Sequence, residues 1–344
     1  MAHGDGSYGF FGAGRTVPEV SNLHHEEEAI LQPLLLKPVF KERIWGGMAL
    51  QKEFGYEISS ELTGECWAIS AHPNGPSVIE NGPYAGMTLD NLWSEHPEVF
   101  GSPKKEVFPL LTKILDANMD LSVQVHPDDA YAKVNENGEL GKTECWYIID
   151  CKEEAEIIFG HNAQSKEELI QHINEGEWNN LLRRVKIKPG DFFYVPSGTI
   201  HALCEGTLVL ETQQSSDTTY RVYDFDRKDA EGNLRDLHLE KAIEVTTVPH
   251  QNAMSSPRVE KVENAMVTTF VESEFFSVYK WDIHGKVSFS FDEQYLLFSV
   301  IKGQGSLIHN GEKYELGKGT HFIIPVGFGE FELDGECEII VSHA

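Results

Sequence analysis

The sequence has few basic residues and no long hydrophobic run. It carries 28 lysines and arginines against 55 aspartates and glutamates, a formal net charge of −27 at pH 7. Contacts with nucleic-acid phosphates and with anionic membranes need clustered basic side chains, so this balance disfavours both kinds of partner. No apolar segment approaches the roughly 20 residues that a membrane-spanning helix needs. An anionic small molecule would require a local basic pocket within an acidic surface.

The chain is also poor in cysteine. The five cysteines are scattered and form no CxxC pair: Cys66, Cys145, Cys151, Cys204 and Cys337. An odd number of dispersed cysteines indicates reduced thiols rather than a disulfide framework. The first residues show no basic segment followed by an apolar one, which is the pattern of a secretory signal. We therefore expect a cytoplasmic protein.

Strand-like patterning fills most of the 344 residues. Short alternating segments separated by Gly- and Pro-containing turns predict a mainly β protein with a few short helices. Because a Gly turn, a strand and a proline recur at 188–196 and 317–325, we expect two small antiparallel barrels or jelly rolls. The expected parts are a tag-like or disordered extension at 1–33, a first domain at 34–248 with a short helical insertion, and a second, degenerate domain at 249–344.

Four short helices are expected, at 88–99, 130–135, 166–174 and 178–182. Ser165 and Glu168 form a capping box that predicts the start of the third. The two repeats differ in chemistry, since His201 lies five residues after Pro196 whereas Glu330 lies five residues after Pro325. We therefore expect the functional site in the first repeat.

Three separate segments each place a ligand-capable side chain at the edge of an apolar run. Gln124 and His126 lie two residues apart in LSVQVHP (121–127), so on a strand they point to the same side. Glu144 lies in GKTECWY (141–147), and His201 ends PGDFFYVPSGTIH (189–201). Two imidazoles, a carboxylate and an amide oxygen suit Zn²⁺ with a position left for substrate. From spacing alone, buried hydrogen-bonded polar residues are an equally good interpretation.

These segments resemble those of the type I mannose-6-phosphate isomerases of the cupin superfamily, in the compact bacterial form. KPVF (37–40), RIWGG (43–47), GECWAIS (64–70) and FPLLTKIL (108–115) precede the three site segments in the family's order, and the resemblance extends from residue 34 to 344. The family binds one Zn²⁺ through a Gln, two His and a Glu. The resemblance therefore implies one Zn²⁺ held by four residues, Gln124, His126, Glu144 and His201. It also implies that the fold consists of two cupin-like jelly-roll barrels, with the catalytic cupin domain at 34–248 and a degenerate cupin domain at 249–344.

The resemblance also implies an activity. Members of the family interconvert mannose 6-phosphate and fructose 6-phosphate by proton transfer through an enediol(ate). Lys142 and Glu211 are then the expected proton-handling pair, with the base undecided between them, and Arg221 is expected to hold the anionic substrate or intermediate. The expected substrate- and phosphate-binding residues are Ser122, Lys113 and Arg227. The alternative for Arg227 is a salt bridge to a neighbouring aspartate, namely Asp217, Asp224 or Asp226.

One departure from the family leaves substrate breadth open. Larger members carry a helical insertion between the Glu ligand and the second His, whereas about 57 residues separate Glu144 from His201 here. A non-catalytic sugar-phosphate-binding cupin and an isomerase of a related sugar phosphate remain as alternatives. We expect a small-molecule sugar phosphate as the partner, neither nucleic acid nor membrane, and a monomer or weak homo-oligomer.

Overall fold

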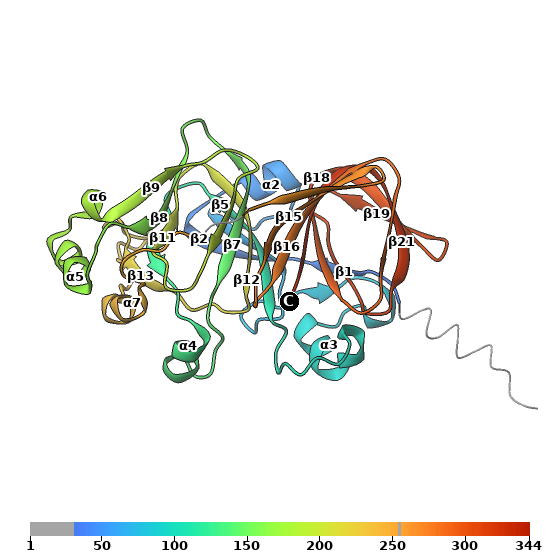
Figure 1. The fold of residues 1–344 in the computed structure, drawn as a ribbon, viewed down its shortest axis with the longest axis horizontal. Helices are drawn as coiled ribbons and strands as arrows, with labels where there is room; N and C mark the ends of the chain where they lie inside the picture. The colour runs from blue at the N-terminus through green and yellow to red at the C-terminus, as the bar shows by residue number, and fades with distance from the viewer. Residues whose placement is uncertain (1–30, 254–255) are drawn as a thin grey trace, which may run out of the picture.

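The computed structural model describes residues 31–253 and 256–344, whose strands form three sheets arranged in two lobes (Figure 1). The prediction of a mainly β protein with short helices is confirmed. The expected extension at 1–33 lies outside the described residues except for its last three. In the described ranges no helix is long and apolar enough to cross a membrane.

The first lobe contains a six-stranded antiparallel sheet in the order β10-β7-β12-β5-β3-β2. Its strands are β2 (Val39–Gly47), β3 (Thr63–Ile69), β5 (Leu110–Ala117), β7 (Glu144–Cys151), β10 (Phe192–Val195) and β12 (Thr207–Gln214). Strands β5 and β12 are buried along their whole length, because other layers cover both faces of the sheet. Polar residues on these strands, such as Lys113 and Glu211, therefore need buried partners.

A five-stranded antiparallel sheet faces it, in the order β13-β6-β11-β8-β9. Its strands are β6 (Val123–Val125), β8 (Glu156–His161), β9 (Leu182–Lys186), β11 (His201–Leu203) and β13 (Tyr220–Tyr223). The two sheets share one hydrophobic cluster, in which Leu115 and Trp146 from the larger sheet join Phe159 and Leu203 from the smaller. The space between these sheets is therefore where side chains from both can meet.

The helices lie mostly at the ends of the lobes (Figure 1). They are α2 (Ala49–Phe54), α3 (Leu89–Glu95), α4 (Asp129–Asn135), α5 (Lys166–Glu175), α6 (Trp178–Leu181) and α7 (Leu239–Val245), with the 3-10 turns η1 (Gly82–Tyr84) and η2 (Pro97–Phe100). The helix expected at 88–99 is interrupted before Pro97, because proline disfavours helical geometry in the residue before it. Ser165 caps α5 as predicted, by accepting a hydrogen bond from the N–H of Glu168.

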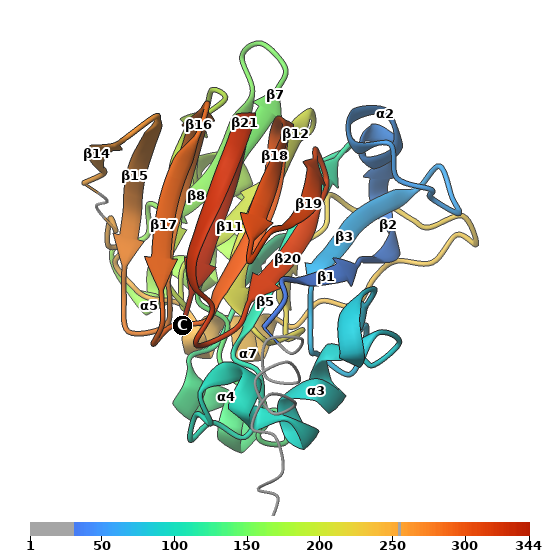
Figure 2. The same ribbon diagram turned by 90° about the vertical axis from the view of Figure 1, so that its right-hand side faces the viewer.

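The second lobe is built on a ten-stranded sheet. Its main path is β14-β15-β16-β21-β18-β20-β1-β4, with β17 paired to β21 and β19 to β18. The strands are β1 (Leu34–Lys37), β4 (Val78–Ile79), β14 (Arg258–Val262), β15 (Ala265–Glu272), β16 (Ser277–His284), β17 (Val287–Phe291), β18 (Leu296–His309), β19 (Glu312–Gly317), β20 (His321–Ile324) and β21 (Gly329–His343). Figure 2 shows this sheet with its long strands in front.

The expectation of two jelly-roll barrels is not confirmed. Within the described residues the three sheets stay open, with β10 and β2, β13 and β9, and β14 and β4 at their ends. The recurring turn, strand and proline correspond to β10 and β20, so the repeat located two strands correctly. Barrel closure depends on long-range pairing that a local repeat does not encode. The domain boundary at residue 248 remains a prediction, and β1 crosses it by pairing with β20.

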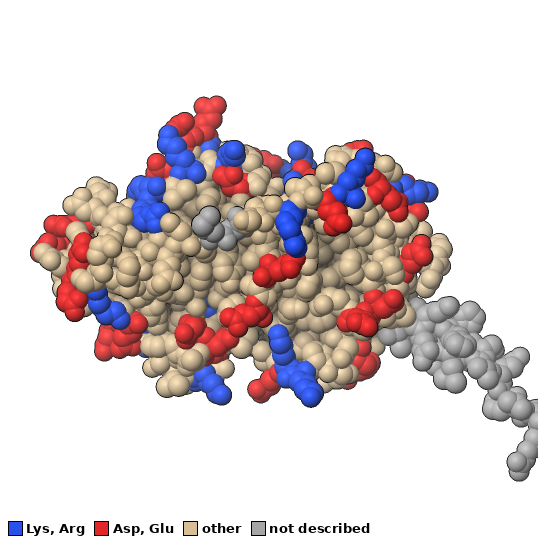
Figure 3. All heavy atoms as spheres, in the orientation of Figure 1, with Lys and Arg blue, Asp and Glu red and all other residues tan. Residues whose placement is uncertain are grey.

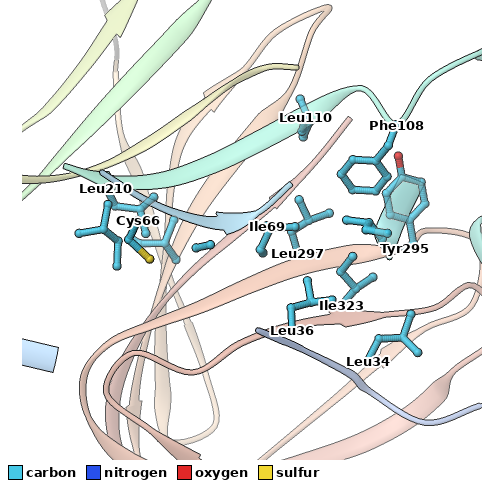
Figure 4. Packing of buried hydrophobic residues seen from close by; sticks show 14 of the residues in the cluster. Leu34, Leu36, Cys66, Ile69, Phe108, Leu110, Leu210, Tyr295, Leu297 and Ile323 are labelled. Carbon is cyan, nitrogen blue, oxygen red and sulfur yellow. The ribbon is translucent and has the colours of Figure 1, made fainter. Parts of the chain in front are cut away.

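The two lobes share a hydrophobic core. Leu110 and Leu210 from the six-stranded sheet belong to the same buried cluster as Leu297 and Ile323 from the ten-stranded sheet (Figure 4). Fully burying one such side chain contributes about 1.5–3 kcal/mol. The second lobe therefore packs against one face of the six-stranded sheet, and the site lies on the other face, which the five-stranded sheet covers.

Candidate metal and substrate site

Three of the four expected ligands meet between the facing sheets. His201 Nε2 lies 3.1 Å from Glu144 Oε1, and His126 Nε2 lies 3.5 Å from Glu144 Oε2. The three side chains are buried, and their potential ligand atoms all lie within 4.8 Å of one another. Glu144 begins β7 of the larger sheet, His201 begins β11 of the smaller one, and His126 directly follows β6. Folding of both sheets is therefore needed to assemble the cluster.

Backbone carbonyls orient both imidazoles. Nδ1 of His126 donates to the carbonyl of Thr218 at 2.9 Å, and Nδ1 of His201 donates to the carbonyl of Thr199 at 2.8 Å. Because a carbonyl only accepts, Nδ1 carries the hydrogen and Nε2 offers its lone pair to the cluster. Burial, and next the ammonium of Lys142, lowers the pKa of His126, which keeps that ring neutral.

The cluster leaves polar atoms without hydrogen bonds. Among the described residues, both carboxylate oxygens of Glu144 and Nε2 of His201 are buried and have no hydrogen-bond partner. Nζ of Lys142 forms an ion pair with Oε2 of Glu144, and buried polar atoms that stay without a hydrogen bond are costly. A cation between the three side chains would satisfy these atoms, so two imidazoles and a carboxylate fit a divalent metal.

Gln124, the fourth expected ligand, lies beside this cluster. It pairs with His201 across β6 and β11, and its Oε1 accepts a hydrogen bond from Ser122 Oγ at 3.4 Å. Both Gln124 and Ser122 line a cavity of about 550 Å³. This volume is within the usual range for small-molecule sites. Six of the predicted site residues line the cavity: Lys113, Ser122, Gln124, Lys142, Glu211 and Arg221.

Lys142 connects the cavity to the cluster. Its Nζ lies 3.1 Å from Glu144 Oε2, 3.3 Å from His126 Nε2 and 4.0 Å from Glu211 Oε1. Burial acts to lower the pKa of Lys142, but the carboxylates of Glu144 and Glu211 outweigh it and raise that pKa. Burial, followed by the charge of Glu144, raises the pKa of Glu211, whose Oε2 accepts a hydrogen bond from Trp146 Nε1 at 3.0 Å. Two titratable groups are thus held within 4.0 Å of each other.

Arg221 lies on the strand next to Gln124. The two residues pair across β13 and β6, and Arg221 Nη1 donates to the carbonyl of Asp236 at 2.8 Å. Burial, and then the neighbouring guanidinium of Arg235, lowers the pKa of Arg221. Its position supports an anion-holding role, which stays a prediction.

Arg227 is placed differently from the other predicted site residues. It is not among the residues that line the cavity. Its Nε and Nη2 donate to Asp224 Oδ1 at 3.0 and 2.7 Å, and its Nη1 donates to the carbonyl of Asp120. This is the salt-bridged arrangement that the sequence left as an alternative. Binding of phosphate by Arg227 stays a prediction.

Comparison with known proteins places the chain in a family. The sequence profile described as phosphomannose isomerase type I, catalytic domain, matches residues 34–149, and that of the mannose-6-phosphate isomerase cupin domain matches residues 266–344. A Bacillus subtilis (strain 168) relative named probable mannose-6-phosphate isomerase GmuF is 62% identical over 311 residues, which cover 90% of this chain and 99% of that protein. The chain belongs to the type I mannose-6-phosphate isomerase family.

The likeness to the family extends through both lobes. Mannose-6-phosphate isomerase ManA of the same organism is 59% identical over 312 residues, which cover 91% of this chain and 99% of the relative. A crystal structure of the mannose 6-phosphate isomerase from Bacillus subtilis matches with a TM-score of 0.90 at 59% identity, and the match covers 91% of this chain and 99% of that one. The cupin-type fold of mannose-6-phosphate isomerases is therefore shared by the chain.

Two charged residues of the cavity, Glu65 and Arg235, were not predicted from the sequence. Glu65 lines it and lies 3.1 Å from Nζ of Lys113, and Arg43 forms an ion pair with the other oxygen of Glu65. Burial acts against ionisation of Glu65, but Lys113 and Arg43 outweigh it and lower its pKa to about 2. A lysine within an apolar strand predicts some acidic partner, and this signal could have pointed to Glu65. Arg235 also lines the cavity and gave no local signal.

Charged side chains of both signs occur on the outer surface and in the cavity. On the face in Figure 3, acidic and basic side chains are interspersed over both lobes. Inside the cavity five basic side chains gather, namely Arg43, Lys113, Lys142, Arg221 and Arg235. Acidic residues line it as well, and Glu65 and Glu211 each lie within 4.0 Å of a lysine Nζ. The cavity thus provides the local basic groups that an anionic substrate of an acidic protein requires.

Proposed function

We propose that this chain is a zinc-dependent isomerase that interconverts mannose 6-phosphate and fructose 6-phosphate. The observation that carries the proposal is the contact of Lys142 with both the His–Glu–His cluster and Glu211 at the wall of one cavity. This arrangement supports proton transfer next to a metal. The relatives at 62% and 59% identity are named as a probable mannose-6-phosphate isomerase and a mannose-6-phosphate isomerase, which supports mannose 6-phosphate as the substrate.

The proposed metal ligands are Gln124, His126, Glu144 and His201. Two neutral nitrogen donors, a carboxylate and an amide oxygen make a donor set that suits Zn²⁺. When bound, the ion would supply Lewis-acid stabilisation of negative charge on a substrate oxygen. The carbonyls of Thr218 and Thr199 support the proposal, because they fix the tautomer in which each histidine can coordinate.

Lys142 and Glu211 are the proposed proton-handling pair. The isomerisation removes the proton from C2 of the open-chain aldose, leaves an enediol(ate), and returns a proton to C1. A carboxyl whose pKa is raised is suited to exchanging a proton near neutral pH, and Glu211 is such a group. The ammonium of Lys142 can donate to the oxygen that gains charge. Which of the two residues takes the C2 proton is decided by the variants described below.

The remaining predicted residues are proposed to orient the substrate. Arg221 would hold oxygens of the substrate or enediolate in a bidentate fork, beside the Gln124 end of the cavity. Ser122 and Lys113 line the same cavity and would donate to hydroxyl or phosphate oxygens. Because Lys113 shares Glu65 with Arg43, its ammonium stays fixed before substrate arrives.

A coupled assay tests the proposal. Mannose 6-phosphate is supplied, fructose 6-phosphate formation is followed through an NADP-linked readout, and the assay is repeated after chelation and after addition of Zn²⁺. We expect turnover that chelation abolishes and zinc restores. Binding of mannose 6-phosphate without turnover would favour a non-catalytic sugar-phosphate-binding protein. Faster turnover of another aldose phosphate would favour a related isomerase.

A further inference from the structure

A hairpin between β13 and α7 borders the cavity. It spans residues 224–238, and within it Lys228 pairs with Leu234. The turn is closed by Asp229, whose Oδ1 accepts hydrogen bonds from two backbone N–H groups of the hairpin. Asp229 and Arg235 both line the cavity, so this hairpin forms one of its walls.

One carboxylate holds the base of the hairpin. Asp224 Oδ1 and Oδ2 accept from Nη2 and Nε of Arg235 at 2.7 and 2.8 Å, and Oδ1 also accepts from Arg227. The Asp224 side chain is only 6% exposed. Phe225 and Asp226, which follow it, have left-handed φ values of 58° and 53°. Two successive non-glycine residues in this region are strained, and such strain persists where surrounding contacts fix the backbone.

Three guanidinium groups gather around Asp224. Arg227 and Arg235 both pair with its carboxylate, and Arg221 lies close enough that the charge of Arg235 lowers its pKa. The charges of Asp224 and Asp236 act in the opposite direction on Arg221, and Asp229 lines the same cavity. A guanidinium with a donor that no carboxylate occupies can bind an anion, and a phosphate monoester carries about −1.5 to −2 at pH 7.

The two arginines on Asp224 differ in what they can still offer. All three nitrogens of Arg227 donate to the protein, to Asp224 and to the carbonyl of Asp120. Arg235 commits Nε and Nη2 to Asp224, while its Nη1 makes no hydrogen bond in residues 31–253 and 256–344. The guanidinium of Arg235 therefore lines the cavity, is held rigidly on one edge and has a free donor.

We propose that Arg235 binds the phosphate group of the sugar phosphate and that Asp224 is the residue that positions it. Arg227 anchors the hairpin to the Asp120 segment, and each of its three nitrogens already donates to the protein. The inference rests on the proposed isomerase function for the identity of the sugar, but the anion site itself is defined by the hairpin. It makes Arg235 a determinant of specificity for phosphorylated over free sugars.

Steady-state kinetics of Arg235→Gln test the proposal. We expect KM for mannose 6-phosphate to rise about tenfold or more, since a charge-assisted contact to phosphate is lost, while kcat changes less than about threefold. The inhibition constant of inorganic phosphate should rise by a similar factor. Arg184→Gln is the matched control, because Arg184 lies on β9 and forms an exposed ion pair with Glu156, with 3.7 Å between Nη1 and Oε2. A folded Arg235→Gln enzyme with the wild-type KM would overturn the proposal.

Two further variants keep the test decisive. Asp224→Asn retains the side-chain shape and removes the charge, and we expect a smaller rise in KM with kcat little changed, which general loss of structure would not produce. If Arg235→Gln does not fold, Arg235→Lys preserves one charge without the fork and should raise KM several-fold. An unchanged KM in folded Arg235→Lys would equally overturn the proposal.

Failure of the isomerase assignment would be separable from failure of this site. If the wild-type protein shows no turnover of mannose 6-phosphate, calorimetric titration with inorganic phosphate still compares wild type with Arg235→Gln. Weaker binding by the variant supports the anion site, whereas equal binding rejects it.

Discussion

Nζ of Lys142 lies 3.1 Å from Oε2 of Glu144, so a proposed proton-handling group touches a proposed metal ligand. Their contact links the proposed proton transfer to the proposed metal site. A divalent ion on Glu144 would compete with Lys142 for the same oxygen and would favour a less strongly protonated lysine. The metal would therefore lower the pKa of Lys142, which lies between the metal ligands and Glu211.

We predict that Lys142→Met loses turnover and keeps its metal. Removal of a general acid or base typically lowers kcat by about 10²–10⁴-fold, and methionine fills a similar volume. Metal analysis and the coupled assay measure the two properties on the same sample. Lys152→Met is the control, because Lys152 is half exposed and pairs with Glu205 at the surface. A variant with wild-type kcat would remove Lys142 from the mechanism.

Glu211→Gln completes this comparison. Glutamine keeps the hydrogen bond from Trp146 Nε1 and removes the ability to take a proton. If Glu211 is the base, its variant should lose as much kcat as Lys142→Met, with KM little changed. A loss confined to Lys142→Met would instead assign the C2 proton to the lysine. Both outcomes are read from kcat for mannose 6-phosphate.

His201→Ala should lose the metal as well as the activity. His201 is fully buried, and its Nε2 has no hydrogen-bond partner in the described part of the chain. Loss of one of four ligands weakens binding enough that metal content after dialysis should fall well below one ion per chain. His96→Ala, at a partly exposed position outside the cluster, is the control. Retention of both zinc and rate by His201→Ala would show that the metal site lies elsewhere.

Much of this site could be predicted because it lies on strands with a period of two. The segments around Gln124, Glu144 and His201 are apolar runs, and a polar residue in such a run is buried and needs a polar or metal partner. Arg235 and its contact with Asp224 were missed because an irregular hairpin makes this contact, and no period constrains the side chains there. The pairing of Leu34 with Ile323 was missed for another reason, since strand patterning does not name a partner so far along the chain.

The ion pairs of Glu65 predict a dependence of stability on acid. Its pKa is lowered to about 2 in the folded protein, against roughly 4.3 for an unperturbed glutamate. The stabilisation is therefore fully present above the unfolded pKa and is lost as pH falls from about 5 towards 2. Thermal unfolding between pH 2 and 7 should show this loss in the wild type.

Glu65→Gln isolates the effect. It leaves Lys113 buried without its carboxylate, and breaking a buried pair costs on the order of 3–5 kcal/mol at neutral pH. The difference from wild type should shrink as pH falls below 4. Glu154→Gln is the control, because its ion pair with Lys186 is exposed. A difference that stays constant from pH 7 to pH 2 would contradict the assigned role of Glu65.

The shared core predicts that the two lobes unfold together. Ile323 is fully buried on β20, and it belongs to the cluster that includes Leu210 and Leu110 of the six-stranded sheet. Ile323→Ala should cost about 2–5 kcal/mol, by lost burial and by the cavity left behind. Because the cluster spans both lobes, hydrogen exchange should show reduced protection in β12 as well as in β18. Val259→Ala, at a position that is 61% exposed, should change neither strand. Loss of protection confined to β18 would mean that the lobes are separate cooperative units. Loss in both strands would mean that the second lobe stabilises the six-stranded sheet, and with it the site.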